Sequence, residues 1–490
     1  MPVLFRHLHF KAWLAALLLT VAACTPFAPK QTGPAPLPLP ERYTLYPQDA
    51  PAEGNRWWLS FDNEELNGLM DDALADSLTL QEAWARLKQS AAQHRVKGAA
   101  LYPTLSGEGG AETTWRGGDD TSEESTDSVS LGLAASYEVD LWGRLKSLEE
   151  SERQRLLASR ADVETAAVTL TGEVAETWVA LVAIRNEIAL VEEQMDLNKT
   201  LLTALTWRFE NSLVSAVDVL RQKKVIERQL SELPSLRLQE SRLEYSLALL
   251  LGKPPGAAPA VRTTALPDVG PLPPTGLPAD LLAMRPDVRA AGLRLRAEEW
   301  EISAARADRL PALSITGRAK YTSDGVDTLF DNWLANLAAN LTGPIFDAGK
   351  RKAGVEKAQA QAEERLATYR RTVLTALSEV ENSLVGEVRQ KETVAALTRE
   401  VETARITLLE AENQYTQGVS DYVNLLDELK DLQELQRKLV QEKARLVKER
   451  VALHRALGGS WPQDLAPEPA RDTATAEGTN EQTKGVPTES

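Results

Sequence analysis

Few residues in the chain could support catalysis or metal binding, and their spacing argues against both. Apart from His7 and His9 near the start, the histidines are His94 and His454, and each stands alone in a helix-like segment. Neither spacing matches a zinc motif or a general-base pair, so we expect both to be ordinary helix-surface residues. Carboxylates are abundant but share helical faces with Lys and Arg, where a solvated ion-pair surface is the expected arrangement.

The stretch from Gly343 to Arg351 contains a Gly-Lys pair that could suggest a phosphate-binding loop. That motif has the form G-x-x-x-x-G-K-[ST]. Here one residue too many separates Gly343 from Gly349, and Arg351 stands where Ser or Thr would hold magnesium. The methionines beyond the first residue are dispersed, at Met70, Met195 and Met284, so a relay of soft-metal ligands is not supported. We therefore predict no enzyme activity, no metal site and no cofactor.

The single cysteine has a position that predicts covalent modification. Residues 1–23 combine a basic start, a short apolar core and small residues directly before Cys24, as in a signal peptide that is removed. The junction resembles the lipobox of bacterial lipoproteins, in which this thiol is acylated and becomes the new N-terminus. Thr25, in place of Asp, favours the outer membrane over retention in the inner one. A buried structural cysteine is the alternative.

Composition and charge narrow the class of protein. The formal net charge is −16 and aromatic residues make up 6% of the 490 residues. Nucleic-acid binding needs clustered Lys and Arg, which the chain lacks. Long stretches rich in Ala, Leu, Glu, Gln and Arg predict extended helices. No segment after the signal approaches the ~20 uninterrupted apolar residues of a transmembrane helix.

Proline-rich and polar segments divide the chain. Residues 24–51 are predicted to form an extended tether, 254–278 a linker, and 462–490 a disordered tail. Residues 52–253 and 279–461 form two copies of one unit, offset by roughly 207 residues. The matching landmarks are Tyr102–Ser106 with Leu310–Ser314, Asp140–Arg144 with Phe346–Lys350, and Phe209–Leu220 with Tyr415–Leu426.

Each copy is predicted to contain a helix, a β-hairpin, a long helix and a return helix. The first helices run from about 62 to 100 and from about 278 to 309, ending before a proline. The first copy then has a hairpin at 104–138, a long helix at 143–210 and a return helix at 216–251. The second copy has the same elements at 312–342, 349–414 and 422–457.

The four strands, of about ten residues each, alternate between apolar and polar side chains. In 128–138, Val129, Leu131 and Leu133 point one way while Ser128 and Ser130 point the other. Such alternation is typical of membrane strands that face lipid on one side and a lumen on the other, with the polar segments 116–127 and 323–332 as external loops. Two soluble hairpins are the alternative. Because four strands cannot close a barrel and open edges are not tolerated in lipid, three chains should supply twelve strands.

The long helices should form a tube. At ~1.5 Å per residue, each extends on the order of 100 Å. Val174, Leu181 and Ile188 recur at every seventh residue, as in a coiled-coil seam. The fold class is therefore an α+β membrane protein: a long α-helical coiled-coil barrel plus a four-strand contribution to a trimeric twelve-stranded transmembrane β-barrel, with internal duplication.

Several segments together resemble one family. They are Trp57–Phe61, Tyr137–Arg144, Arg285–Ala291, Pro344–Lys350 and Leu457–Trp461. The chain from Cys24 to Trp461 is similar to the outer membrane factor (TolC-like) family, in its lipoprotein efflux branch, the NodT-type outer membrane subunits of resistance-nodulation-division tripartite pumps. The resemblance implies a homotrimer that docks on a periplasmic adaptor (membrane fusion) protein and an inner-membrane pump of that class.

The function that the resemblance implies is passive export of small molecules, such as drugs and toxic compounds, across the periplasm and outer membrane. The alternative is the outer-membrane duct of a type I protein secretion system. A third hypothesis is a structural envelope lipoprotein without a pore.

The resemblance also implies a gate at the periplasmic tip. Its inward side chains match Val423 and Asp427 here, and threefold symmetry would bring three Asp427 carboxylates into a cation-attracting ring. A solvated helix residue is the alternative for Asp427. Two positions depart from the family pattern. Ser212 replaces a turn glycine, which puts the geometry of the first turn in doubt, and Lys430 replaces an arginine, which puts a tip salt bridge in doubt.

Overall fold

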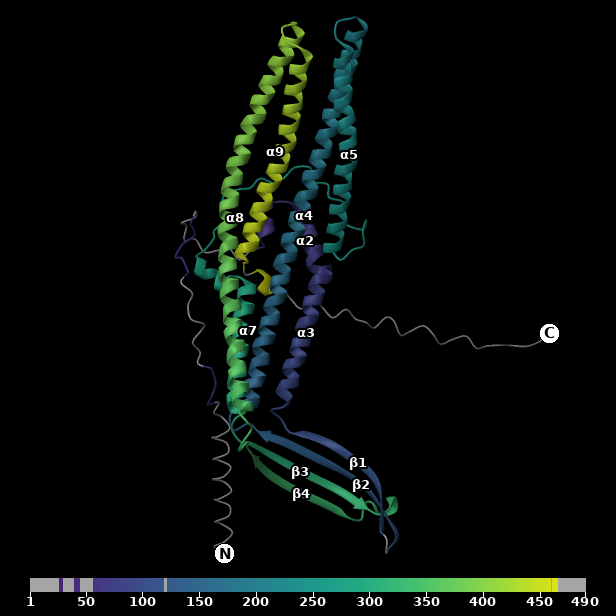
Figure 1. Ribbon diagram of the computed structural model, residues 1–490, viewed down its shortest axis with the longest axis vertical. Helices are drawn as coiled ribbons and strands as arrows, with labels where there is room; N and C mark the ends of the chain where they lie inside the picture. Colours follow the sequence, from purple (N-terminus) through teal and green to yellow (C-terminus); the bar gives the residue numbers. More distant parts are fainter. Residues whose placement is uncertain (1–25, 30–38, 45–55, 119–120, 460, 466–490) are drawn as a thin grey trace, which may run out of the picture.

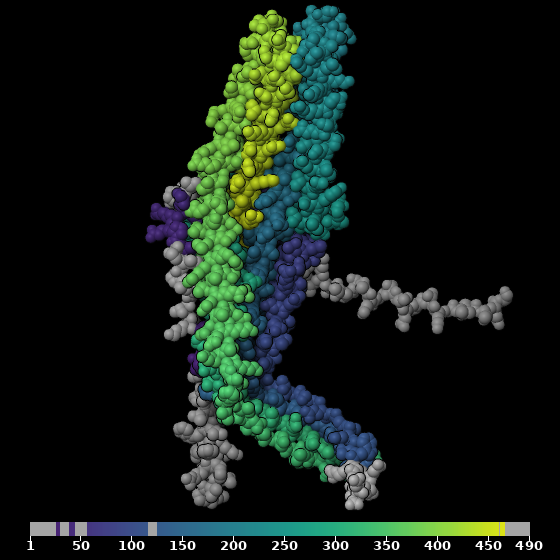
Figure 2. Space-filling model, viewed as in Figure 1, coloured from purple at the N-terminus to yellow at the C-terminus, as the bar shows by residue number. Residues whose placement is uncertain are grey.

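The structure is a computed structural model that describes residues 26–29, 39–44, 56–118, 121–459 and 461–465. Cys24, the predicted signal, most of the tether and most of the tail lie outside these residues. The described chain is elongated, with a β-sheet at one end and two antiparallel helix pairs extending to the other (Figure 1 and Figure 2). The sheet and the helical tips are therefore at opposite ends.

The same order of elements occurs twice along the chain. The first series is η1 Trp57–Phe61, α2 Glu64–Asp76, α3 Leu78–Ala99, β1 Thr104–Gly118, β2 Thr121–Val139, α4 Arg144–Glu210 and α5 Ala216–Leu250. The second is η2 Pro278–Asp280, α6 Leu281–Met284, α7 Pro286–Ala307, β3 Ala312–Ser323, η3 Val326–Thr328, β4 Trp333–Thr342, α8 Lys350–Thr416, α9 Tyr422–Leu457 and η4 Trp461–Asp464.

The first helix of each series is broken, so the prediction of one continuous helix there is wrong. In the first, Ser77 is extended at ψ 126° and separates α2 from α3. In the second, Arg285 takes ψ 118° because it precedes Pro286, whose ring disfavours a helical predecessor. The proline was visible in the sequence; the break at Ser77 has no such local signal.

All four strands join one antiparallel sheet in the order β1-β2-β3-β4. β1 and β2 are 15 and 19 residues long, and β3 and β4 are 12 and 10. The prediction of ten-residue strands and of a loop at 116–127 is therefore wrong for the first hairpin, whose pairing continues to Gly118 and Thr121. Beyond a membrane both faces of a hairpin can be polar, so polarity there does not indicate a loop.

In each series, a motif with Asp and Gly connects the second strand of the hairpin to the long helix that follows. Both oxygens of the Asp140 carboxylate accept backbone N–H bonds, from Leu145 at 3.0 Å and Lys146 at 2.8 Å, and Gly143 supplies the left-handed φ of 73°. These bonds satisfy N–H groups that have no partner within the helix. Asp347 and Gly349 repeat the arrangement before α8. The copies are tied together here, because Trp142 Nε1 donates to the Pro311 carbonyl at 2.7 Å.

The seven-residue seam of α4 is buried. Val174 and Leu181 have no exposed surface and Ile188 is 9% exposed, and α4 contacts α3, α5, α7 and α9. Among the described residues, α4 is the one helix long and apolar enough in part to cross a membrane, which the sequence analysis did not expect. Most of that stretch is buried against other helices, as in the core helix of a bundle.

The turns at the helical tips have the same backbone geometry in both copies, despite the Ser for Gly difference. Ser212 has φ 60° and Gly418 has φ 73°. Leu213 N–H donates to the Arg208 carbonyl at 2.8 Å, and Val419 N–H donates to Gln414 at 2.9 Å, which is the same helix-terminating pattern. Ser212 therefore keeps the tip geometry at the cost of a strained conformation.

Replacing Ser212 by Gly should stabilise the first tip. A side chain in the left-handed region costs about 1 kcal/mol relative to glycine, so Ser212→Gly should raise the thermal unfolding midpoint slightly. Gly418→Ala should lower it by a similar amount. Far-UV circular dichroism in detergent measures both. Equal midpoints for the two variants would contradict this account of the turns.

Candidate functional site

The sheet has one apolar and one polar face. The apolar side chains are Leu105, Ala111 and Trp115 in β1, Val129, Leu131, Leu133, Ala135 and Tyr137 in β2, Leu313, Ile315, Ala319 and Tyr321 in β3, and Trp333, Ala335, Leu337, Ala339 and Leu341 in β4. The apolar face is open: Leu337 is 80% exposed and Leu341 67%. A solvent-facing sheet surface of this kind needs lipid or protein to cover it.

Aromatic residues lie near both ends of the apolar face. Tyr321 pairs with Trp333 next to the distal turn of the second hairpin, and Trp115 lies near the distal end of β1. Tyr137 lies near the junction with α4. Aromatic girdles at two interfaces are typical of outer-membrane strands. The opposite face is polar, carrying Ser, Thr, Asn, Glu, Arg and Lys with Leu334 as an exception, as in the wall of a water-filled lumen.

At the far end of the helices, Val423 and Asp427 share one face of α9, one turn apart. This face is separate from the buried stripe that contains Tyr422, Leu425 and Leu426. Val423 is half-buried, and the Asp427 side chain is 57% exposed. Lys430 Nζ lies 2.6 Å from Asp427 Oδ1, so the lysine forms a salt bridge within its own helix.

A buried polar network holds α9 against the first helix pair just below the tip. Tyr422 Oη donates to Gln222 Oε1 at 2.7 Å, and Gln222 Nε2 donates to both Asn198 oxygens at 2.9 Å. Asn198 Nδ2 continues the chain to Gln229 at 3.1 Å and Gln433 at 3.3 Å. Each side chain makes at least one of these hydrogen bonds, although Gln433 Nε2 is buried without a partner. The network therefore fixes the register of α9 on α4 and α5.

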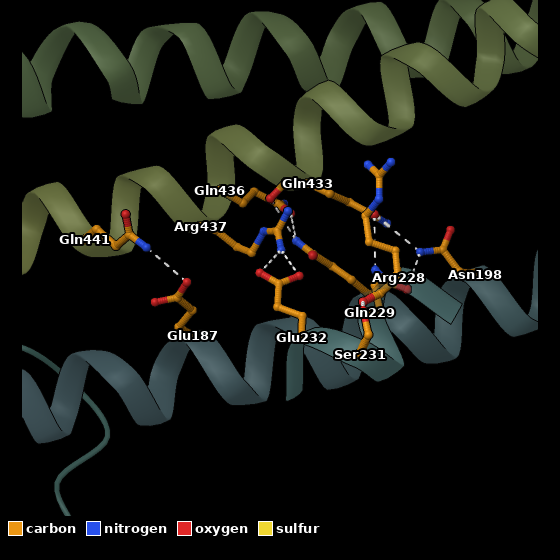
Figure 3. A network of polar contacts seen from close by, with 11 residues as sticks. Glu187, Asn198, Arg228, Gln229, Ser231, Glu232, Gln433, Gln436, Arg437 and Gln441 are labelled. Carbon is orange, nitrogen blue, oxygen red and sulfur yellow. Dashed lines mark hydrogen bonds and ion pairs between the residues drawn. The ribbon is translucent and has the colours of Figure 1, made fainter. Parts of the chain in front are cut away.

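Figure 3 shows further polar contacts between α9 and the first helix pair. Arg437 Nη1 donates to both carboxylate oxygens of Glu232 at 2.8 Å, and Gln441 Nε2 donates to Glu187 at 3.0 Å. α4 and α5 belong to the first series of elements and α9 to the second, so polar contacts join the two series along the helix pairs. Near the tip, α4 and α9 also share an apolar cluster, which consists of Leu205, Tyr422, Leu425 and Leu426.

We did not predict this polar network, although the spacing of polar residues on α5 indicates it. Gln222, Gln229 and Leu236 are spaced by seven residues on α5, so the two glutamines occupy the positions of a seam. Gln222 is fully buried and Leu236 is 6% exposed. Polar residues at heptad positions commonly specify register.

Near mid-length, a buried ion pair links α8 and α9. Arg450 donates to both oxygens of Glu387, from Nε at 2.8 Å and from Nη2 at 2.7 Å, and Nη2 also donates to the Gly270 carbonyl of the linker at 3.0 Å. Burial raises the pKa of Glu387, but hydrogen bonds from Arg450 and Lys391 outweigh it, so the pKa lies below its usual value. Glu387 is therefore ionised and structural.

His454 lies beside this pair and is not the surface residue that we expected. Its ring stacks on Trp57, with centroids 5.3 Å apart and planes 17° from parallel, and its Nε2 is buried without a hydrogen-bond partner. It lines a cavity of about 660 Å³ beneath the linker. His94 is also not freely exposed: its side chain is 25% exposed and its Nε2 lies 3.5 Å from Glu149.

The burial of His454 predicts a pH dependence of stability. Burial and, secondarily, Arg450 lower the pKa of His454 to about 4, while Glu387 acts in the opposite direction. The unfolded chain binds a proton at His454 below about pH 6.5, and the folded chain does so only near pH 4. The free energy of unfolding should therefore fall by about 3 kcal/mol as the pH is lowered through this window. The thermal unfolding midpoint of the parent and of His454→Gln is measured as a function of pH. The midpoint should depend less on pH in the variant, and an equal dependence would contradict the assignment to His454.

Comparison with known proteins decides the family. The sequence model of the outer membrane efflux protein family matches residues 69–253 and 277–459, which together cover most of the chain. The chain belongs to the outer membrane efflux protein family. The two matched ranges correspond to the two series of elements.

Similar proteins support this along nearly the whole chain. The pyoverdine export outer membrane protein OpmQ of Pseudomonas putida is 31% identical over 463 residues, covering 92% of this chain and 97% of that protein. The solvent efflux pump outer membrane protein SrpC of Pseudomonas putida is 31% identical, covering 82% and 86%. The crystal structure of CusC superposes with a TM-score of 0.81 at 26% identity, covering 88% of this chain and 99% of that one.

This efflux protein is thus an outer-membrane channel component of an export system and not an enzyme. Its mixed fold, mostly helical with one sheet, is that of the outer-membrane channels. The sheet is the part suited to the membrane, and the helices extend from it into the periplasm.

Proposed function

We propose that three copies of this chain close into one passive duct, with twelve strands in the outer membrane and the helices as a periplasmic tube. The single observation that carries the proposal is the open sheet: β1 and β4 are both edges. Unpaired backbone groups are not tolerated in lipid, and pairing β4 of one copy with β1 of the next removes every edge. Three four-stranded sheets give an even-numbered barrel.

The helical part supports the same assembly. α8 carries exposed apolar side chains along much of its length, with Leu374 52%, Ile406 60% and Leu409 59% exposed. Its partners within the chain are mainly α7 and α9. A second copy that packs on this outer face would bury these residues while it pairs the strands. Internal duplication explains why each copy of the unit supplies one hairpin and one helix pair.

The lipid anchor is a further part of the proposal. Acylation of Cys24 after removal of residues 1–23 would attach the N-terminus to the membrane that holds the barrel. Two acyl signals or more give stable anchoring. Intact-protein mass spectrometry should find a lipid-bearing N-terminus that is lost in Cys24→Ser.

The cargo and the partners complete the proposal. The names of the relatives include pyoverdine, solvent and cation export, and these cargoes are small solutes or ions. We propose small-molecule efflux through a periplasmic adaptor and a resistance-nodulation-division pump, with Val423 and Asp427 as the periplasmic gate. The exposed position of Asp427 on α9 supports a role at the tip.

Cross-linking between strand edges tests the assembly. β1 and β4 lie at opposite edges of the sheet in one chain, so a cysteine in each can be joined by a short reagent only between copies. Gly109→Cys combined with Ala335→Cys, or with Leu337→Cys to allow for the register, should give dimers and trimers on denaturing gels. Each single variant is the control. If every pair of cysteines gave only monomer on the gel, the closed barrel would be contradicted.

A further inference from the structure

Besides Glu138, the polar face of the sheet carries four charged residues at defined levels among the side chains that the structure describes. Glu108 in β1, Gly132 in β2, Lys320 in β3 and Leu334 in β4 lie directly across from one another in one row. The next row toward the helices contains Arg318 between Ala134 and Asn336. Glu112 lies four residues beyond Glu108 on β1, two rows further from the helices, opposite Ser128.

These charges are free to act on a passing solute. Glu108, Glu112, Arg318 and Lys320 are all exposed, and within the described part of the chain no ion pair involves any of them. By contrast, Glu138 on the same face is held by Arg144, whose Nη2 lies 2.8 Å from both of its oxygens.

Small residues of β2 lie between the acidic residue of β1 and the basic residues of β3. Glu108 and Lys320 are two strands apart, about 10 Å, and the strand between them presents Gly132. A Cβ on Gly132 would lie 2.7 Å from the Cβ of Lys320, so the backbones approach closely there and β2 places no side chain between Glu108 and Lys320. Ala134 has the same position beside Arg318.

We infer that Glu108, Glu112, Arg318 and Lys320 form a charged belt that sets the charge selectivity of the outer-membrane part of the duct. The inference rests on the proposed trimer, in which threefold repetition places acidic and basic side chains alternately around the wall. A twelve-stranded barrel is about 24 Å across between backbones, and side chains narrow this further. Since screening at 0.15 M salt acts over about 8 Å, a solute in the lumen lies within reach of both charge types.

The two halves of the belt have opposite effects on cargo. Arg318 and Lys320 favour anions and oppose cations; Glu108 and Glu112 do the reverse. With both present, the barrel accepts solutes of either sign and favours those that carry both charges, because such a solute can orient toward both sets. These four residues are therefore specificity-determining positions for passage through the barrel.

Reversal potentials across planar bilayers test the belt. Under a KCl gradient, Arg318→Gln with Lys320→Gln should raise the ratio of cation to anion permeability several-fold, and Glu108→Gln with Glu112→Gln should lower it several-fold. Each pair of substitutions is measured in the parent and in the Asp427→Ala background. The tip and the barrel are in series, so a selective tip could hide a change in the selectivity of the barrel. Ala134→Gln, which adds an uncharged amide to the Arg318 row, should leave the ratio unchanged.

Opposite shifts support the belt. Permeability ratios that stay unchanged, both with the parent tip and with Asp427→Ala, overturn the inference; this result is expected if Glu108 and Lys320 neutralise each other. Shifts of the same sign in both pairs of variants also overturn it. Either result leaves the duct itself intact, since current still flows. A parent and Asp427→Ala that both carry no current overturn the proposed function as well as the belt.

Discussion

Replacing Asp427 by Ala should raise the single-channel conductance of the purified protein several-fold and weaken its block by divalent cations. In the proposed trimer, three Asp427 carboxylates converge at the narrow end of the tube, obstruct it and attract cations into the constriction. The smaller alanine side chain widens the constriction, which raises the conductance. The substitution also removes the negative charge and frees Lys430, whose Nζ is 2.6 Å from Asp427 Oδ1, so divalent cations bind the tip less well. Planar bilayer recordings with and without divalent cations measure the effect.

Asp196 provides a matched control for this substitution. It is also exposed, and it also forms an ion pair with a lysine three residues on, Lys199 at 2.9 Å, but it lies on α4. Asp196→Ala should leave the currents near those of the parent. Parent-like currents in Asp427→Ala would remove this residue from the gate and favour the alternative of a solvated helix residue.

Replacing Arg450 by Met should destabilise the protein by about 3 kcal/mol. Removing one member of a buried ion pair leaves an uncompensated charge, at a cost of about 3–5 kcal/mol. Glu387 is completely buried, although Lys391 Nζ at 2.9 Å remains as a partner, which places the effect at the lower end. The thermal unfolding midpoint in detergent should fall clearly, and the linker should loosen because the Gly270 carbonyl keeps only its longer hydrogen bond, from Lys391 Nζ at 3.3 Å.

Two further variants separate charge from packing at this site. Replacing both partners, with Glu387→Leu and Arg450→Met, should recover much of the loss, because no buried charge remains unpaired. Arg389→Met breaks an exposed pair on α8, with side chains 66% and 60% exposed, and should have little effect. If the double variant were no more stable than Arg450→Met alone, the loss would come from packing and the ion-pair account would be wrong.

The elements that the sequence predicted well are those with a strict period. Alternation in β2 to β4 predicts the two faces correctly because cross-strand partners share a face, so Leu131, Tyr321 and Trp333 fall on one side. The long helices α4 and α8 follow from seven-residue spacing without prolines. Their starts follow from the Asp and Gly motifs, which Asp140 and Gly143 explain through hydrogen bonding and backbone conformation.

The features that were missed depend on contacts between distant segments. His454 looks like a helix-surface residue until the Trp57 segment and the linker cover it. The break at Ser77 has no proline or glycine to mark it. The extended first hairpin was missed because pairing between its strands continues where apolar alternation stops. At the tip, the backbone at Ser212 could not be predicted, since a Ser adopts the left-handed region only when the surrounding turn requires it.

Conductance of the purified assembly tests the central claim most directly. Detergent-extracted protein, with its trimeric mass and lipid verified beforehand, is added to planar bilayers as the parent and as Asp427→Ala. A passive duct predicts discrete current steps, larger in the variant, without any energy source. Folded trimers that insert but carry no current in either form would contradict the account and favour an envelope lipoprotein without a pore.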